Sequence, residues 1–323
     1  MSLKLRRVKA TALYDNPLGD PYEREVALWV PPGGPHPALL ALPGFTGSHY
    51  GFLNRRWRSE SLPERLERLQ ADGMPPCIVV MPDVMTTVGG SQYLDTPTIG
   101  AYATWLCDEL LPLVDAEFPT TGSWGVFGKS SGGYGALHLS MTRPGRFQAL
   151  AAHAPDCGFA YGYAPDFPAA VESIRRAGGL EAWWERFLSG GELKGEDHGV
   201  INLIAMSMCY SPNVKAQPIP ADLPVDLETG ETRSEVFERW AAFDPAEMVS
   251  GHASNLEGMS IWLDCGRRDE FRLQVGARMV RRAFQAHGVA HHYEEHEGGH
   301  FKLNSRLDLS LPFLAQALTK AQR

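Results

Sequence analysis

One serine in this chain stands between two glycines, at a place where a nucleophile could act. Residues 128–132 read Gly-Lys-Ser-Ser-Gly, so Ser130 has a glycine two positions away on each side. A short apolar run ends at Phe127, and a segment of helical character follows the motif. A sharp strand-to-helix turn holds a serine hydroxyl above the sheet and leaves space only for small neighbours. The pattern predicts that Ser130 is a nucleophile; the alternative is a small-residue turn that serves packing alone.

A nucleophilic serine needs a base for its proton and an acid that orients the base. In the C-terminal third, an apolar run through Asp264 leads into Gly-Arg-Arg-Asp-Glu at 266–270. We expect Asp269, just beyond the predicted strand, to be the acid. Asp264 lies within the strand, where packing or a supporting contact is the expected role, and Glu270 is a further alternative.

The expected base is His300, which follows Glu-Gly-Gly directly after the last predicted strand. The two glycines permit a close approach to the nucleophile, and His296 at the strand end is the alternative. Histidines at 287, 291, 292, 296 and 300 raise the question of a metal. Neighbouring strand residues point to opposite faces, and Gly298-Gly299 disfavours a helix that would align 296 with 300. We therefore expect no metal site.

Acyl transfer also requires N–H donors for the developing oxyanion. The residue after the nucleophile, Ser131, is expected to supply one, and the loop at 43–46 the other. Phe45 is the expected donor in that loop, with Thr46 as the alternative. Lys129, next to the nucleophile, either attracts an anionic substrate group or extends along the surface to keep its charge in water.

These residues follow a regular alternation of strands and helices. Strands are expected near 3–13, 24–31, 38–42, 77–81, 123–127, 148–153, 260–265 and 290–296, and helices near 61–71, 99–118, 131–142, 273–287 and 303–321. The alternation predicts an α/β fold in which helices cover both faces of a mostly parallel sheet. The chemistry-bearing residues stand at strand ends, where such folds build their sites.

One stretch, residues 157–257, interrupts this alternation. It carries aromatic and helical segments and a proline-rich part, and loops of such length are usually functional. We interpret it as a cap over the active site within a single domain, 1–323. The alternative is an excursion of the scaffold with no role in substrate binding.

The composition excludes several classes of protein. The 323 residues are 44% hydrophobic and 21% charged, with a net charge of −8, which disfavours nucleic-acid partners and anionic membranes. The five cysteines form no Cys-x-x-Cys pair, and neither a secretory signal nor a membrane span is recognisable. A cytoplasmic location is expected.

Three stretches of the chain are similar to the putative-esterase family of α/β-hydrolases, which includes S-formylglutathione hydrolases, enterochelin esterases and feruloyl esterases. They are residues 89–112, residues 127–137 and the pair of segments 264–269 and 298–300. The resemblance implies an α/β-hydrolase fold, Ser130 as nucleophile, Asp269 as acid and His300 as base. Pro43-Gly44 stands where the family usually has His-Gly.

The resemblance also implies that the loop 89–93 lies near the active-site entrance, so Ser91, Gln92 and Tyr93 are candidate substrate neighbours. It implies a small-molecule ester as substrate and no cofactor. Family members often self-associate, so a homo-oligomer is an expectation that rests on the resemblance alone.

The expected function is that of a serine carboxylesterase that works through an acyl-enzyme. An acyltransferase would use the same intermediate with an alcohol as acceptor, for which the 157–257 segment would have to exclude water. A non-catalytic scaffold that kept the fold is the third possibility, and it is disfavoured by the intact order of serine, aspartate and histidine.

Overall fold

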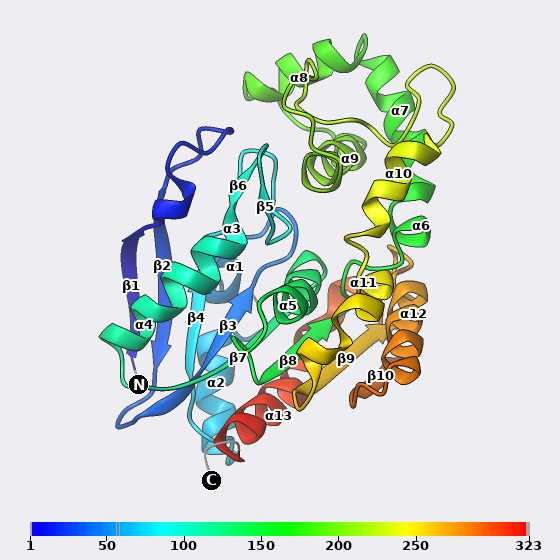
Figure 1. The fold of residues 1–323 in the computed structure, drawn as a ribbon. Coiled ribbons are helices and arrows are strands. Elements are labelled where there is room, and N and C mark those ends of the chain that lie inside the picture. Colours follow the sequence, from blue (N-terminus) through cyan, green and yellow to red (C-terminus); the bar gives the residue numbers. More distant parts are fainter. Residues whose placement is uncertain (1, 56, 58, 321–323) are drawn as a thin grey trace.

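A central twisted sheet organises the computed structural model, which describes residues 2–55, 57 and 59–320. In this part of the chain the sheet has eight strands in the order β1-β2-β4-β3-β7-β8-β9-β10. Their bounds are β1 Ser2–Lys9, β2 Glu23–Val30, β3 His36–Leu42, β4 Ile78–Pro82, β7 Thr120–Lys129, β8 Ala149–His153, β9 Ser260–Gly266 and β10 His292–His296. The pairs from β4 to β10 are parallel, and β1 and β2 add an antiparallel edge (Figure 1). The expected α/β-hydrolase sheet is confirmed.

Apolar side chains alternate between the two faces of the sheet and meet different helices. In β3, Leu39 packs with the core beneath α2 (Leu62–Ala71) and α13 (Leu307–Lys320). Its neighbour Leu40 belongs to the opposite core, which holds α4 (Leu111–Glu117), α5 (Ser131–Thr142) and α12 (Leu273–Ala286). Successive strand residues point to opposite faces, so a wholly apolar strand is the pattern that a sheet covered on both sides requires.

Several element boundaries differ from those expected. The first strand stops at Lys9, and the chain continues into a 3-10 turn, Thr11–Leu13. Residues 95–101 form a short hairpin, β5 (Asp95–Thr96) with β6 (Gly100–Ala101), so the helix expected from 99 begins at Tyr102. The helix expected from 303 is preceded by a 3-10 segment that starts at His300.

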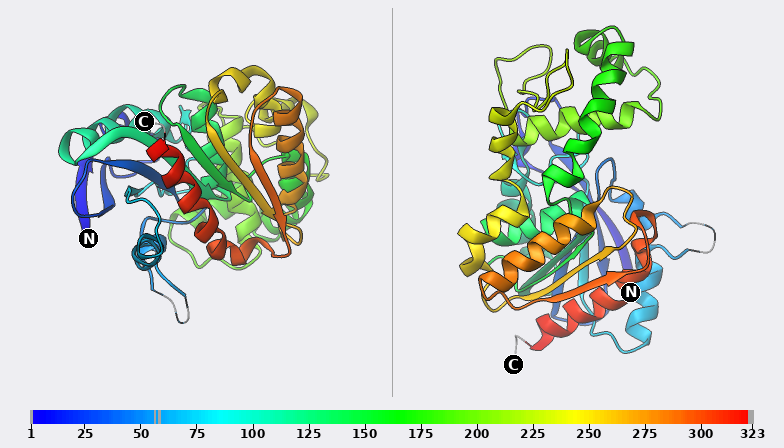
Figure 2. Two further views of the ribbon diagram at one scale, coloured as in Figure 1. Left: turned by 90° about the horizontal axis from the view of Figure 1, so that it is seen from below. Right: turned by 90° about the vertical axis from the view of Figure 1, so that its right-hand side faces the viewer.

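Most of the segment 157–257 forms a layer of helices beyond the carboxyl ends of the parallel strands, and its last helix packs beside α5 and α12 (Figures 1 and 2). Its helices are α6 Phe159–Gly162, α7 Phe167–Arg176, α8 Leu180–Leu188, α9 Asp197–Tyr210, α10 Ser234–Ala241 and α11 Pro245–His252. Rings of Phe159, Tyr163, Tyr210 and Trp240 pack together at centroid distances of 4.9 to 6.4 Å. These aromatic side chains therefore form much of the packing of the segment itself, and they join the main core.

Asp244 ties the two ends of this layer together. Its carboxylate accepts the N–H groups of Gly158 and Phe159, at 2.9 and 2.6 Å, where the segment begins. It also caps α11 through the N–H of Ala246. The layer is thus fixed to the sheet body where it leaves and where it returns.

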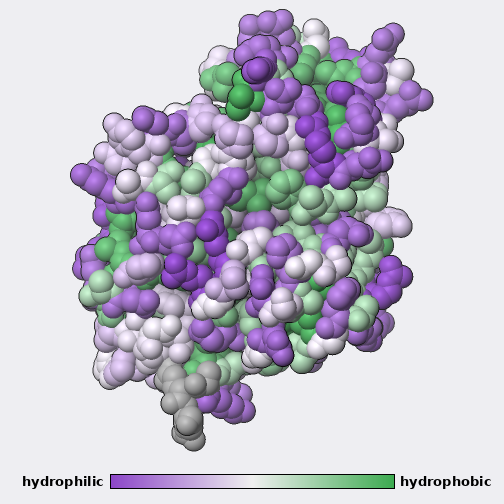
Figure 3. All heavy atoms as spheres, viewed as in Figure 1, coloured by the Kyte–Doolittle hydropathy of each residue, from purple (hydrophilic) through white to green (hydrophobic). Residues whose placement is uncertain are grey.

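The surface is mixed in polarity, with polar and apolar residues interspersed over the face seen in Figure 3. Over the described ranges, no helix is long and apolar enough to cross a membrane. The five cysteines are all free and buried, and a buried free cysteine behaves as a small hydrophobic residue.

Candidate active site

Ser130 stands on a strained turn between β7 and α5. Its backbone has φ 58° and ψ −125°, a region that residues with a side chain rarely adopt. Such a conformation costs about 1–3 kcal/mol and persists only where the surroundings enforce it. The Ser130 N–H donates to the carbonyl of His153 at 2.9 Å, which fixes the turn against β8.

The two flanking glycines are needed because the backbone segments around the turn nearly touch. A Cβ on Gly132 would lie 2.1 Å from the carbonyl oxygen of Leu42. A Cβ on Gly128 would lie 2.4 Å from the carbonyl group of Gly132. The local motif therefore shapes the turn directly, as the sequence predicted.

Asp269 and His300 form a buried pair beyond the ends of β9 and β10. The Asp269 Oδ2 atom lies 2.8 Å from Nδ1 of His300, and their side chains are 0% and 5% exposed. The other carboxylate oxygen of Asp269 accepts the N–H of Phe271 at 2.9 Å. This bond holds the carboxylate in one orientation, and the carboxylate in turn orients the imidazole.

Neighbouring groups fix the loop that carries His300. The Glu270 carboxylate accepts the backbone N–H of His300 at 2.6 Å, so this alternative acid supports the loop. Rings of Phe271 and Phe301 stand edge-on to the imidazole, with centroids 4.8 and 5.6 Å away. The alternative base, His296, accepts the N–H of Gly298 through Nδ1, and burial lowers its pKa.

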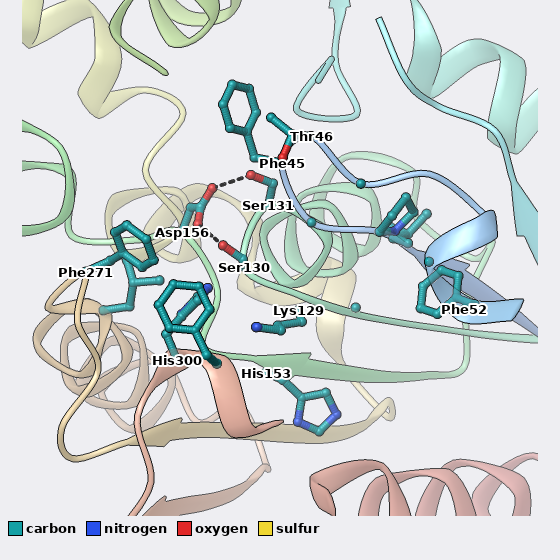
Figure 4. Close-up of a pocket in the computed structure, with 18 of the residues that line it drawn as sticks. Phe45, Thr46, Phe52, Lys129, Ser130, Ser131, His153, Asp156, Phe271 and His300 are labelled. Atoms are coloured by element: carbon teal, nitrogen blue, oxygen red, sulfur yellow. Dashed lines mark hydrogen bonds between the residues drawn. The ribbon is translucent and has the colours of Figure 1, made fainter. Parts of the chain in front are cut away.

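Ser130 and His300 line one cavity of about 580 Å³, shown in part in Figure 4. Its walls come from the loop after β3, from α1 (Tyr50–Leu53) and α2, from the helical layer and from the loops after β9 and β10. The helical layer contributes Tyr163, Asp166, His198, Gly199 and Asn202 among others. The segment 157–257 thus forms one wall of the cavity.

In the structure the Ser130 hydroxyl donates to Asp156 Oδ1 at 3.2 Å, and among the described residues it makes no hydrogen bond to His300 (Figure 4). The distance between Ser130 Oγ and Asp156 Oδ1 is long for a hydrogen bond from a hydroxyl group, which usually measures about 2.7–2.8 Å between the two oxygens. Asp156 follows β8. From the sequence, His153 and Asp156 at the end of this strand could either reach the site or only cap the turn, and the structure places the Asp156 carboxylate beside the nucleophile. Its position right after a central parallel strand is the sequence signal for such a role.

The two expected oxyanion donors come from the loop after β3 and from the first residue of α5. Phe45 and Ser131 both line the cavity, and neither N–H donates to another described residue. The N–H of the alternative donor, Thr46, is used within the loop, where it donates to Gly89 O at 2.8 Å. This geometry favours Phe45 over Thr46.

Asp264 belongs to a buried network that extends through His153, which lines the cavity, to α13. It accepts from His153 at 2.8 Å, from Trp262 at 2.8 Å and from Arg306 at 3.0 Å. The second nitrogen of His153 lies 2.9 Å from the hydroxyl of Ser310. Burial alone would raise the pKa of Asp264, but His153, Trp262 and Arg306 outweigh it and hold the pKa at about 2.

The loop expected near the entrance lies beneath the cavity wall. Ser91, Gln92 and Tyr93 are buried, and the Gln92 amide donates to Asp156 and to the hydroxyls of Tyr163 and Tyr210. Tyr93 donates its hydroxyl to the carbonyl of Pro43, which supports the oxyanion loop. None of the three lines the main cavity in the described structure, so a direct substrate contact stays a prediction.

Lys129 does line the main cavity. Its ammonium group lies 5.5 Å from the centroid of the Phe301 ring.

Within the described residues, no group of three His, Cys, Asp or Glu side chains is arranged to hold a metal ion.

The fold and the site define an α/β-hydrolase. The model of the putative esterase family matches residues 21–304, and the chain belongs to this family. A stretch of 144 residues is 28% identical to S-formylglutathione hydrolase of Mus musculus, and the same identity holds for the Rattus norvegicus protein. This stretch covers 41% of the chain and 51% of each relative, so about half the length of these relatives is matched.

Solved structures share the fold over nearly the whole chain. A ferulic acid esterase superposes with a TM-score of 0.62 at 18% identity, over 98% of both chains. An S-formylglutathione hydrolase from Agrobacterium tumefaciens superposes with a TM-score of 0.60 at 17% identity, over 98% of this chain and 95% of that one. At these identities the likeness concerns the fold.

Proposed function

We propose that this protein is a serine carboxylesterase in which Ser130, His300 and Asp269 act as a catalytic triad. One observation carries the proposal. Ser130, on a strained strand-to-helix turn, lines the same cavity as His300, and His300 is hydrogen-bonded to the buried carboxylate of Asp269. This arrangement fits the roles of nucleophile, base and orienting acid.

In the first half of the reaction, the Ser130 hydroxyl turns from Asp156 towards His300. Its oxygen attacks the ester carbonyl carbon while the imidazole takes the proton. The Phe45 and Ser131 N–H groups are the donors proposed for the oxyanion. As the tetrahedral intermediate collapses, the bond to the alcohol oxygen breaks, and His300 gives that oxygen its proton.

In the second half, a water molecule replaces the alcohol beside His300. The imidazole takes a proton from this water, and the resulting hydroxide attacks the acyl-enzyme carbonyl. Collapse of the second intermediate releases the carboxylic acid and returns the proton to Ser130. Asp269 stabilises the imidazolium in both halves, because its carboxylate lies at the opposite ring nitrogen.

The first experiment is hydrolysis of p-nitrophenyl esters from acetate to palmitate by the wild type and by Ser130→Ala. S-formylglutathione is tested as a further substrate, because the two relatives from Mus musculus and Rattus norvegicus are named S-formylglutathione hydrolase. The proposal expects turnover that depends on chain length and is lost in the variant. Turnover that persists in Ser130→Ala would contradict it.

A further inference from the structure

The two oxygens of the Asp156 carboxylate accept different numbers of hydrogen bonds. The side chain is 6% exposed and lies between the nucleophile turn, the loop 89–93 and the helical layer. Its Oδ2 atom accepts from Ser131 Oγ at 2.7 Å, from Tyr163 Oη at 2.8 Å and from Gln92 Nε2 at 3.1 Å. In contrast, Oδ1 accepts only from Ser130 among the described residues, at 3.2 Å.

The partners of Oδ2 are firmly placed. Burial and the Asp156 charge raise the pKa of Tyr163 well above its usual range, so its hydroxyl stays protonated and donates. The Gln92 amide is held by the Tyr210 hydroxyl as well. The carboxylate is therefore fixed in orientation, with Oδ1 turned towards Ser130 on the cavity wall (Figure 4).

In the proposed reaction, Oδ1 loses the one donor that it has among the described residues. When the Ser130 hydroxyl turns to His300 and its oxygen bonds to the substrate, it no longer donates to Asp156. A buried acceptor that loses its donor is costly, and a charged one more so. A substrate that brings its own donor to this position restores the hydrogen bond while the reaction proceeds.

The acyl group is the part of the substrate that lies nearest to Oδ1. The serine oxygen bonds to the acyl carbonyl carbon, and this bond persists through the acyl-enzyme. The leaving alcohol must lie near His300, from which it takes its proton. In the view of Figure 4, Asp156 approaches Ser130 from above and His300 from below, so the two residues face different sides of the nucleophile.

We propose that Asp156 recognises a hydroxyl or ammonium group on the α-carbon of the acyl group. The favoured substrates are then esters of 2-hydroxy or 2-amino acids. This inference rests on the proposed function and names the substrate class of the same site. A plain alkyl acyl group would instead leave the charged Oδ1 without a donor close to the developing oxyanion.

The test compares ethyl isobutyrate, ethyl lactate and ethyl alaninate, which place CH₃, OH or NH₃⁺ at the same position. Hydrolysis is followed by pH-stat, and each kcat/KM is divided by the rate constant for hydrolysis by hydroxide alone. The normalised value for lactate or alaninate should exceed that for isobutyrate by about tenfold or more. Values within about twofold for all three esters would overturn the inference.

Asp156→Asn keeps the shape of the side chain and removes its charge. The normalised preference should fall about tenfold for the ester that the wild type favours. The matched control is Tyr163→Phe, which removes one donor to Oδ2, leaves Oδ1 charged, and should keep the preference. An unchanged preference in Asp156→Asn, or an equal loss in both variants, would contradict the assignment.

A preference is a ratio within one enzyme, so it does not depend on the fraction that is correctly folded. If Asp156→Asn yields no active protein, the wild-type comparison still decides. Hydrolysis of none of the three esters, together with no labelling by a serine-directed phosphonate, would contradict the proposed function and this inference with it. Labelling and hydrolysis without a preference would overturn the inference alone.

Discussion

The carboxylate of Asp269 lies 2.8 Å from Nδ1 of His300, and both side chains are buried. This pair is assembled from two loops that follow neighbouring parallel strands, β9 and β10. In this setting the carboxylate selects the ring tautomer that leaves the other nitrogen free to accept a proton.

Asp269→Asn should lower kcat by about 10³- to 10⁴-fold, because an amide can favour the wrong tautomer and cannot stabilise the imidazolium. The substitution preserves shape, so the melting temperature should change little in comparison with kcat. Steady-state hydrolysis of p-nitrophenyl butyrate measures the effect. A loss below about tenfold would assign the acid role elsewhere.

Asp264→Asn is the matched control for Asp269→Asn, and it should lower the free energy of unfolding. It leaves the Arg306 and His153 network without its carboxylate, and breaking a buried ion pair costs about 3–5 kcal/mol. The activity of the folded fraction should stay within a few-fold of the wild type. Urea unfolding with parallel activity assays separates the two effects, and a loss of kcat as large as that of Asp269→Asn would contradict the separation.

The same carboxylate predicts a pH dependence of stability. The pKa of Asp264 is lowered to about 2 in the folded protein, against an ordinary value of 3.8. Its contribution is therefore complete above about pH 4 and is lost as the pH falls through 2. Between pH 5 and pH 2, the difference in unfolding free energy between wild type and Asp264→Asn should shrink; a constant difference would contradict the lowered pKa.

His138 should make stability fall at mildly acidic pH. It is buried in α5 and stacked on Tyr134, and burial, aided by the charges of Arg143 and His252, lowers its pKa from 6.5 to about 3. Because the unfolded chain takes up the proton first, the free energy of unfolding decreases as the pH falls below about 6.5. The decrease from this group is about 2 kcal/mol at pH 5.

His138→Gln, which does not titrate, should show a smaller decrease than the wild type between pH 7 and pH 5. Urea titrations of both proteins at several pH values measure the two slopes. Equal slopes would show that His138 does not carry this pH dependence.

Gly132→Ala should disrupt the nucleophile turn. The new methyl group would lie 2.1 Å from the Leu42 carbonyl oxygen, so the backbone must shift and Ser130 must move with it. The matched control is Gly251→Ala in α11, where the methyl group meets nothing within 4 Å and alanine favours the helix. Activity should be lost only in Gly132→Ala; comparable activity in both variants would contradict the packing argument.

The sequence alone predicted the sheet and the residues at its ends because their signals are local. Ser130 is marked by its flanking glycines, Asp269 follows the apolar strand β9, and His300 follows β10 after the glycine pair at 298–299. The boundary errors have local causes as well, since the hairpin at 95–101 depends on backbone pairing and leaves little trace in the composition.

The contacts of Asp156 could not be predicted in this way. Its partners Ser130, Gln92 and Tyr163 are 26, 64 and 7 residues away, and the Tyr210 hydroxyl that holds Gln92 is 118 residues from it. Positive φ angles at Gln92 and Tyr93 turn that loop inward beneath the cavity wall. Such convergence depends on the folded helical layer and has no sequence period.

The central claim is that Ser130 is the nucleophile, and covalent labelling tests it most directly. A fluorophosphonate is incubated with the wild type and with Ser130→Ala, and the adduct is located by intact mass and peptide mapping while ester hydrolysis is followed in parallel. The account predicts a single adduct on Ser130 that appears as activity disappears, and no adduct in the variant. An adduct on another residue, or wild-type turnover by Ser130→Ala, would contradict it.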